Sequence, residues 1–401
     1  MNTRSQTSIW NPTFLSVFLV NFSLQMGQYM MNTLIPKYAA HLGAAASVVG
    51  LVSSIFALTA LAIRPVSGPA FDYFSKKRLL TLTTGIIAAA FVGYSLSSSV
   101  AMVIFCRLLH GVGVGCTAPL ALAIASDALP EEKMGSGLGI FSLAQAVSSA
   151  IGPSIGLSLS DSLGYNKTFA IGAVLVALSC GLTNIIWEPE RKTPRGAFRI
   201  TPDRIIAREA VIPAVIMAFL SMSYACINAF IALYGESRGV EHIGLYFTVY
   251  AVFLLMSRPL SGTIADRFGL DRAIVPACLF FAASFFLLSR AASLPAFLSA
   301  AAVSAFGYGA CQPAIQALCM RCVSKERRGV GANTNYFGTD VGQLLGPSIA
   351  GRIAESVQAS GTQADGYAMV YRCMIVPILI AMGLFLINRR RLLEMSSRQQ
   401  N

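Results

Sequence analysis

Twelve apolar stretches divide the chain, and each is long enough for a helix to cross a lipid bilayer, which takes about 20 residues. The stretches run approximately over residues 13–36, 47–70, 79–98, 100–124, 136–160, 165–187, 210–234, 243–265, 273–289, 295–320, 330–352 and 367–388. Short polar segments separate them. This pattern predicts an all-α integral membrane protein with twelve transmembrane helices.

The composition agrees with this interpretation and excludes a soluble protein. Hydrophobic residues make up 55% of the 401 residues, charged residues make up only 12%, and the mean hydropathy is +0.64. An ordinary soluble domain has about 25% charged residues. The formal net charge of +12 is the Lys and Arg excess that cytoplasmic loops carry, so we expect no nucleic-acid partner.

The distribution of Lys and Arg predicts the orientation of the chain. The loops on the side of the two termini hold 21 of these residues, the loops on the opposite side hold six, and three lie within apolar stretches. Basic residues are enriched in cytoplasmic loops. We therefore expect both termini in the cytoplasm and the chain in the plasma (inner) membrane.

The nine cysteines fall almost wholly within apolar stretches, where a free cysteine behaves as a small hydrophobic residue. Cys319 and Cys322 have the C-x-x-C spacing, but the sequence offers no second ligand pair for them. We therefore expect no disulfide framework, no metal site and no cofactor.

An internal repeat relates the two halves of the sequence. A shift of 194 residues aligns the halves without a gap, over about ninety positions. The register places Arg64-Pro65-Val66-Ser67-Gly68 against Arg258-Pro259-Leu260-Ser261-Gly262, and Gly152-Pro153-Ser154-Ile155 against Gly346-Pro347-Ser348-Ile349. Because the copies are six spans apart, corresponding spans cross the membrane in the same direction, so these are parallel repeats. Transporters with such repeats bind their substrate near the middle of the membrane, between two halves that rock against each other. We predict two pseudo-symmetric six-helix bundles, 1–187 and 210–401, joined by a cytoplasmic linker at 188–209.

Two copies of one motif resemble the cytoplasmic signature of the major facilitator superfamily. They read Gly68-x-x-x-Asp72-x-x-x-Lys76-Lys77-Arg78 after the second span and Gly262-x-x-x-Asp266-Arg267-x-Gly269 after the eighth. The resemblance implies a conformational latch that stabilises the outward-facing form, with gating roles for Gly68, Asp72, Arg78, Gly262, Asp266 and Arg267. The chain departs from the family at Ser75, where a turn glycine is expected, and it lacks the basic run after Gly269. The alternative is an ordinary basic loop with a tight turn.

The fourth span is similar to a second motif of this family, an arginine followed by a glycine-rich stretch. It reads Arg107-Leu108-Leu109-His110-Gly111-Val112-Gly113-Val114-Gly115, with His110 where the family has Gln. Histidine titrates near neutral pH and glutamine does not, and an intramembrane arginine needs a cavity or a partner. We expect Arg107 and His110 to take part in proton coupling or to bind an anionic substrate group. The alternative is that Arg107 bonds to backbone carbonyls and that His110 is a packing group.

The fifth span resembles the signature associated with exporters of the family. It reads Gly139-x8-Ser148-x3-Gly152-Pro153-x2-Gly156, with Ser148 and Leu157 where the family has Gly. Small residues permit tight helix crossing and proline permits a bend, so Gly152, Pro153, Gly346 and Pro347 are candidate gating residues. Because the second half repeats the motif as Gly342-x3-Gly346-Pro347-x2-Ala350-Gly351, the motif alone does not specify export.

Asp340 is the leading candidate for the proton-carrying group. It lies midway through the eleventh span, roughly 15 Å from either helix end at about 1.5 Å per residue, and no other acid lies so deep. Its counterpart in the repeat is Ala146, so the acid is not part of the shared scaffold. Intramembrane acids are functional more often than not, since they can bind and release a proton as a cavity changes sides. The alternatives are a static pair with an arginine and a neutral, hydrogen-bonded acid.

Polar residues form stripes on four spans at helical spacing. The stripes are Asn21, Gln25, Gln28 and Asn32; Ser221, Tyr224 and Asn228; Tyr308, Gln312 and Gln316; and Asn333, Tyr336, Asp340 and Gln343. The resemblance implies that the first, fourth, seventh and tenth spans line a central cavity. We therefore expect a substrate cavity lined by Gln25, Gln28, Asn32, Tyr224, Asn228, Tyr308, Gln312, Gln316, Asn333, Tyr336 and Gln343. The alternative is hydrogen bonding between helices without substrate contact.

Together these features predict a secondary active transporter that exports a small organic solute or metabolite by proton-coupled antiport with alternating access. The alternative is a proton symporter for uptake of a small metabolite, since the first span lacks the acid that many drug:proton antiporters of the family carry. No catalytic constellation and no phosphate-cradling G-x-x-x-x-G-K-[ST] motif occurs, so we expect neither an enzyme nor an ATP-driven pump. The expected partners are a small-molecule substrate, protons and membrane lipids, and we expect a monomer.

Overall fold

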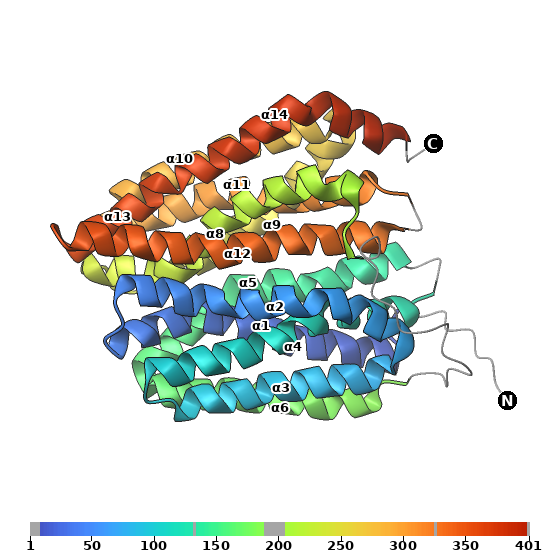
Figure 1. Ribbon diagram of the computed structural model, residues 1–401, viewed down its shortest axis with the longest axis horizontal. Coiled ribbons are helices and arrows are strands. Elements are labelled where there is room, and N and C mark those ends of the chain that lie inside the picture. Colours follow the sequence, from blue (N-terminus) through green and yellow to red (C-terminus); the bar gives the residue numbers. More distant parts are fainter. Residues whose placement is uncertain (1–8, 131–133, 188–204, 325–326, 399–401) are drawn as a thin grey trace. The chain divides into compact units, whose positions relative to one another are not determined.

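The computed structural model describes residues 9–130, 134–187, 205–324 and 327–398, and this part of the chain is helical without strands (Figure 1). The first half forms α1 (Pro12–His41), α2 (Ala46–Tyr73), α3 (Lys76–Leu96), α4 (Val100–Asp127), α5 (Met134–Leu163), α6 (Tyr165–Leu182) and the short 3₁₀ helix η2 (Thr183–Ile185). The second half forms the 3₁₀ helix η3 (Arg208–Ala210), α8 (Val211–Ser237), α9 (Leu245–Phe268), α10 (Leu270–Arg290), α11 (Leu294–Arg321), α12 (Arg328–Gln358), α13 (Gln363–Cys373) and α14 (Ile375–Arg398).

All twelve predicted stretches fall on these helices, and α13 with α14 forms the last of them, Gln363–Met395. The predicted all-α membrane fold is therefore confirmed. Eight of the described segments are long and apolar enough to cross a membrane by length and composition alone. The helices α1 and α12 are not among the eight, because the polar stripes predicted for them lower their hydropathy.

The last span contains a break at Met374. The sequence predicts one helix over 367–388, whereas α13 ends at Cys373 and α14 begins at Ile375. Pro377 has no N–H group, so the carbonyl of Cys373 lacks the helical donor four residues further on. The Ser223 hydroxyl donates a hydrogen bond of 2.8 Å to the carbonyl of Met374 and so supplies a partner to the backbone at the break.

The described residues form two compact units. The first unit contains the residues up to Leu34 and those from Ala62 to Trp187, and the second contains Ile35–Leu61 and the residues from Ile205 onward. The last turns of α1, from Ile35, and the first part of α2, up to Leu61, thus belong to the second unit. The division of the chain at 187 and 210 stays a prediction, and most of the linker, residues 188–204, lies outside the described residues.

Three glycines bring α12 against α8 in the second unit. A Cβ atom on Gly338, Gly342 or Gly346 would lie 2.1, 2.2 and 2.1 Å from the carbonyl oxygens of Ala214, Ala218 and Met222, respectively. Both sets are spaced four residues apart, so each lies along one face of its helix. Because no side chain separates the two backbones, the orientation of α12 about its own axis is fixed by this contact.

The first unit has a smaller version of the same contact. A Cβ atom on Gly152 of α5 would lie 3.0 Å from Cβ of Tyr29, and one on Gly156 would lie 3.3 Å from Cα of Met30. The Ser148 hydroxyl donates a hydrogen bond of 3.3 Å to the carbonyl of Phe22 on α1. Small residues on α5 therefore pack on the backbone of α1, where the sequence predicted tight helix crossing.

Candidate functional site

Arg107 lies within the packed interior of the first unit. It belongs to the third turn of α4 and is 1% exposed. Its guanidinium group is hydrogen-bonded to the hydroxyl of Tyr94 on α3. A neutral hydroxyl thus faces this buried charge, and a guanidinium needs such an acceptor because burial removes it from solvent.

His110 lies one turn further along α4 and shares the same partner. Its Nδ1 atom is 3.3 Å from the Tyr94 hydroxyl oxygen. The imidazole ring meets Phe91 edge-on, with 5.0 Å between ring centroids. The structure therefore brings Arg107 and His110 together through Tyr94 and places the imidazole among aromatic rings, as in the packing alternative.

Asp340 is the only buried acid among the residues that the structure describes, with 6% of its surface exposed. It lies halfway between Gly338 and Gly342, which face α8. Since successive helical residues are about 100° apart, its side chain leaves α12 on the side away from α8. Tyr336 and Gln343 lie on that same side, and both are partly exposed.

The polar stripes of α8 and α11 meet each other in the second unit. The rings of Tyr224 and Tyr308 are stacked, with centroids 4.0 Å apart and planes 4° from parallel. The Tyr308 hydroxyl lies 3.5 Å from the Ser221 hydroxyl, and Tyr250 of α9 adds a third ring 6.2 Å from Tyr224. Asn228, Gln312 and Gln316 are partly exposed. These helices thus present a surface of aromatic rings and uncharged amides, which can stack on a planar group and bond to a polar one.

Asn333, the first residue of the predicted α12 stripe, contacts the end of the linker. Its side-chain amide donates a hydrogen bond of 2.9 Å to the carbonyl of Ile205. The next residue, Thr334, accepts a hydrogen bond of 2.9 Å from the backbone N–H of Ala207. Nearby, Arg327 and Glu209 form an ion pair at 3.1 Å. We call Ile205–Ala210 the linker end. Side chains of α12 and of Arg327, just before α12, hold the linker end in place.

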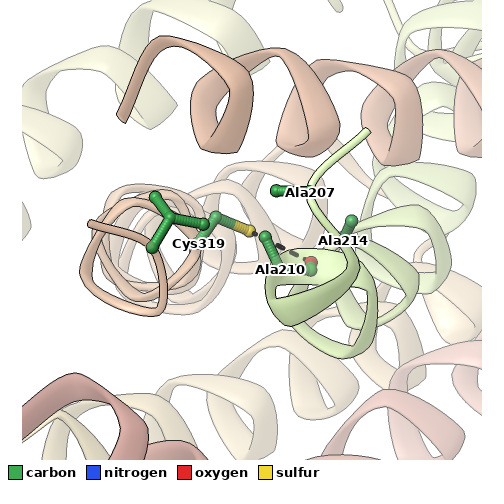
Figure 2. Packing of buried hydrophobic residues seen from close by; sticks show 5 residues of the cluster. Ala207, Ala210, Ala214 and Cys319 are labelled. Carbon is green, nitrogen blue, oxygen red and sulfur yellow. Dashed lines mark hydrogen bonds between the residues drawn. The ribbon is translucent and has the colours of Figure 1, made fainter. Parts of the chain in front are cut away.

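Small buried residues pack around the linker end (Figure 2). Ala207, Ala210 and Ala214 pack with Cys319 and Val323 at the end of α11. Figure 2 shows the Cys319 thiol directed at the carbonyl of Ala210, 4.0 Å away. Because alanine and cysteine are small, the linker end approaches α11 closely and excludes water from this contact.

The first half of α2 packs on the far end of α12 within the second unit, a contact that we call the α2–α12 seam. The Ser54 and Ser348 hydroxyl oxygens lie 2.7 Å apart. The backbone N–H of Ser47, in the first turn of α2, donates a hydrogen bond of 3.2 Å to the carboxylate of Glu355. A carboxylate at this position also interacts favourably with the N-terminal end of the helix dipole.

Glycines make the seam a contact between two backbones. A Cβ atom on Gly50 would lie 2.1 Å from the carbonyl oxygen of Pro347, and one on Gly351 would lie 2.4 Å from that of Ala46. Pro347 is one of the residues that the sequence proposed for gating. The seam therefore leaves no room for a side chain at either glycine.

The two copies of the predicted latch differ in their turns. Gly269 has a φ of +95°, a conformation that favours glycine. Ser75, at the matching position, has a φ of −60°, and its hydroxyl accepts a hydrogen bond from the backbone N–H of Arg78. The departure at Ser75 is thus a helix N-cap.

The remaining candidates are placed as follows. Gln25, Gln28 and Asn32 are partly exposed on α1, Pro153 is buried on α5, and Arg78 and Arg267 are exposed at helix ends. The surroundings of Gly68, Asp72, Gly262 and Asp266 lie outside the described residues. Within the described ranges, no group of three or more His, Cys, Asp and Glu side chains is placed to hold a metal ion.

Sequence reasoning missed Tyr94, Glu355 and the Ser54–Ser348 pair. Tyr94 lies two residues before the end of α3, where a tyrosine is usual at the membrane interface, so nothing in the sequence marks it as a partner of Arg107. Ser348 lies within the repeated motif beside Pro347, and this was the only available signal for the seam.

The comparisons with known proteins agree on one family. The family model described as the Major Facilitator Superfamily matches residues 17–347 and, in a second match, 213–399. The multi-drug resistance efflux pump PmrA of Streptococcus pneumoniae is 24% identical over 363 residues, which cover 86% of this chain and 90% of that protein. The staphylopine export protein of Staphylococcus aureus is 25% identical over 258 residues, which cover 61% of this chain and 64% of that protein.

The fold is that of solved transporters. The crystal structure of a mutant of the nucleoside transporter NupG superposes with a TM-score of 0.79 at 12% identity, covering 94% of this chain and 99% of that one. At this identity the likeness shows the fold alone. Because the family model matches most of the sequence, the chain belongs to the Major Facilitator Superfamily and is a membrane transporter of a small-molecule substrate.

Proposed function

We propose that this transporter exports a small organic solute in exchange for protons. The observation that carries the proposal is Asp340, a buried acid midway along α12. The printed names of two relatives, an efflux pump and an export protein, support the outward direction. In this proposal both termini lie in the cytoplasm, the chain acts in the plasma membrane as a monomer, and it has no enzymatic activity.

Asp340 is the proposed proton carrier. Its helix is held against α8 by glycines on one side, so the carboxyl faces the other side together with Tyr336 and Gln343. An acid at this depth is stable when it is protonated or when it faces water or a partner. Exposure of the cavity to alternate sides then lets the carboxyl bind a proton on one side and release it on the other.

Arg107 and His110 are the proposed coupling residues of the first unit. The guanidinium group keeps its charge at every physiological pH, so it can bind an anionic group of the solute or take part in proton coupling. His110 contacts the shared Tyr94 hydroxyl and acts in this proposal through that hydroxyl.

The α2–α12 seam is the proposed gate on the side of the membrane away from the linker. Asn333 and Glu355 of α12 are 22 residues apart, about 33 Å along a helix at 1.5 Å per residue, so the seam and the linker end lie at opposite ends of α12. The seam depends on two hydrogen bonds and close backbone packing. Contacts of this kind break without leaving a buried charge, which suits a gate that opens in each transport cycle.

The solute is proposed to bind at the polar and aromatic surface of the second unit. Tyr224 and Tyr308 offer stacked rings, and Asn228, Gln312 and Gln316 offer amides. In the first unit, Gln25, Gln28 and Asn32 of α1 are the proposed solute-binding residues.

Transport by purified protein in proteoliposomes tests the proposal, with staphylopine and the dye ethidium as solutes. With the vesicle lumen acidified, protons leave the vesicle down their gradient, so an antiporter accumulates solute inside. Accumulation that occurs only with an acidic exterior would show symport and overturn antiport.

Two variants locate the proton carrier. Asp340→Asn is expected to lose gradient-driven accumulation and to retain some exchange of solute across the membrane. Asp127→Asn is the matched control, since Asp127 is an exposed acid paired with Lys76 at 2.5 Å. Unchanged uphill transport by Asp340→Asn would remove Asp340 from the mechanism.

A further inference from the structure

Tyr94 is a fully buried residue whose hydroxyl joins the two candidate coupling residues of the first unit. It is 0% exposed, at the end of α3. Its oxygen lies 3.3 Å from Nδ1 of His110 and is hydrogen-bonded to the guanidinium of Arg107. One oxygen atom thus contacts both groups.

The ring of Tyr94 is held in place by three helices. Its centroid is 5.8 Å from that of Phe91 on α3, 5.9 Å from Phe169 on α6 and 6.1 Å from His110 on α4. Phe91 in turn fills the space beside Gly27, where an added Cβ would lie 2.9 Å from the Phe91 ring. Rings packed on several sides have little freedom, so the hydroxyl has a fixed position.

The Tyr94 hydroxyl can bond to both groups at once. A guanidinium only donates hydrogen bonds, so the Tyr94 oxygen accepts from Arg107. The hydroxyl keeps one proton and a second lone pair, so it pairs with Nδ1 of His110 as donor or as acceptor, according to the tautomer of the imidazole. His110 thereby orients the hydroxyl, and the hydroxyl orients the guanidinium.

We infer that Tyr94 is a positioning residue for Arg107 in the transport reaction. The arginine side chain has several rotatable bonds, and a rigid acceptor restricts where its charge lies. Without the hydroxyl the guanidinium loses this restraint, and its charge is no longer held in place for the proposed role. This inference rests on the role proposed above for Arg107.

Four variants test the inference by uptake of ethidium and staphylopine in the same vesicles. Tyr94→Phe keeps the ring packing and removes one hydroxyl, and it is expected to lower the initial rate about tenfold, as the loss of one hydrogen bond to a charged group does. Tyr246→Phe is the matched control, since this tyrosine is equally buried and its hydroxyl has no hydrogen-bond partner among the described residues; it is expected to stay within about twofold of the wild type.

The combination with Arg107→Lys separates positioning from packing. If Tyr94 acts through the guanidinium, the variant that carries both changes is no slower than Arg107→Lys alone. Losses that multiply, or a Tyr94→Phe rate equal to that of Tyr246→Phe, would overturn the inference.

A measurement without solute separates this inference from the proposed function. Side-chain ¹⁵N NMR of arginine-labelled protein reports how fast each guanidinium group rotates, and the signal missing in Arg107→Lys identifies Arg107. Slow rotation is expected in the wild type and in Tyr246→Phe, and fast rotation is expected in Tyr94→Phe. Unchanged rotation in Tyr94→Phe overturns the inference whatever the vesicles transport. Normal transport by Arg107→Lys removes the proposed role of Arg107 and with it the effect of Tyr94 on transport, whereas the rotation still shows whether Tyr94 holds the guanidinium.

Discussion

The hydroxyl oxygens of Ser54 and Ser348 lie 2.7 Å apart, although 294 positions separate the two residues in the chain. Ser54 lies on α2 and Ser348 on α12, and both belong to the second compact unit. The N-terminal part of α2, a helix from the first half of the sequence, therefore packs against a helix from the second half. This contact is the one that the proposed gate must open.

A cross-link across this pair is expected to stop transport. In the double variant Ser54→Cys, Ser348→Cys the two thiols lie within reach of a disulfide bond, and the mild oxidant diamide is expected to form it. Ethidium accumulation should then fall at least about tenfold and recover after dithiothreitol, because alternating access requires the seam to open. Mass spectrometry of the cross-linked peptide verifies the bond.

The single variant Ser54→Cys, treated with diamide in the same way, is the control and should keep its activity. Undiminished accumulation by the fully cross-linked protein would contradict the proposed gate.

The glycines of α12 yield a prediction about stability. Gly342→Ala places a Cβ atom 2.2 Å from the carbonyl oxygen of Ala218, so α8 and α12 must move apart. We expect a loss of about 1–3 kcal/mol in the free energy of unfolding, the usual cost of overpacking, measured by thermal unfolding in detergent.

Gly383→Ala on α14 is the control, because a Cβ atom there meets nothing within 4 Å. This change should leave the stability equal or slightly higher, since alanine favours the helix. A Gly342→Ala protein as stable as Gly383→Ala would show that the α8–α12 contact can relax.

Properties that follow from local sequence were predictable. The twelve spans follow from apolar runs of about the thickness of the bilayer. Gly342 and Gly346 lie in a motif with small residues at helical spacing, and this spacing indicates a tight helix contact before any partner is known. Asp340 is conspicuous because an acid is rare in such a run.

Properties that depend on a partner from elsewhere in the chain were not predictable. Asn333 shares a helical face with Asp340, so the sequence grouped it with the substrate cavity, while its amide bonds to the carbonyl of Ile205. Tyr94 has no neighbour in sequence that marks it, and its role depends on the packing of α3 against α4. The break at Met374 has a local signal in Pro377, but the Ser223 hydroxyl that bonds to the Met374 carbonyl lies on another helix.

The contact of the linker end with α11 and α12 predicts the reactivity of Cys322. Burial and the negative charge of Glu209 raise the pKa of the Cys322 thiol to about 11. The thiol is therefore protonated at pH 7, and its reaction with N-ethylmaleimide is expected to be slow and to speed up as the pH rises toward this pKa.

Loosening the linker end should expose this thiol. The variant Thr334→Val removes the acceptor for the N–H of Ala207, and we expect labelling of Cys322 at pH 8 to rise several-fold, as judged by mass spectrometry. The control is Thr339→Val, which removes a hydroxyl that donates a hydrogen bond to the carbonyl of Asn335 within α12. Equal labelling in both variants would mean that the linker end does not shield Cys322.

The stacked tyrosines of the second unit predict how a planar solute binds. Tyr224 is partly exposed and its ring is backed by Tyr308, 4.0 Å away, so one rigid aromatic surface is available to a ligand. Stacking on such a ring contributes about 0.5–1.5 kcal/mol beyond the buried area.

Tyr224→Ala should therefore raise the KM for ethidium by about two- to tenfold with little change in the maximal rate, because it removes binding and not proton transfer. Tyr224→Phe keeps the aromatic ring and should stay near the wild type. A fall in the maximal rate at unchanged KM would place Tyr224 in the conformational change and not in solute binding.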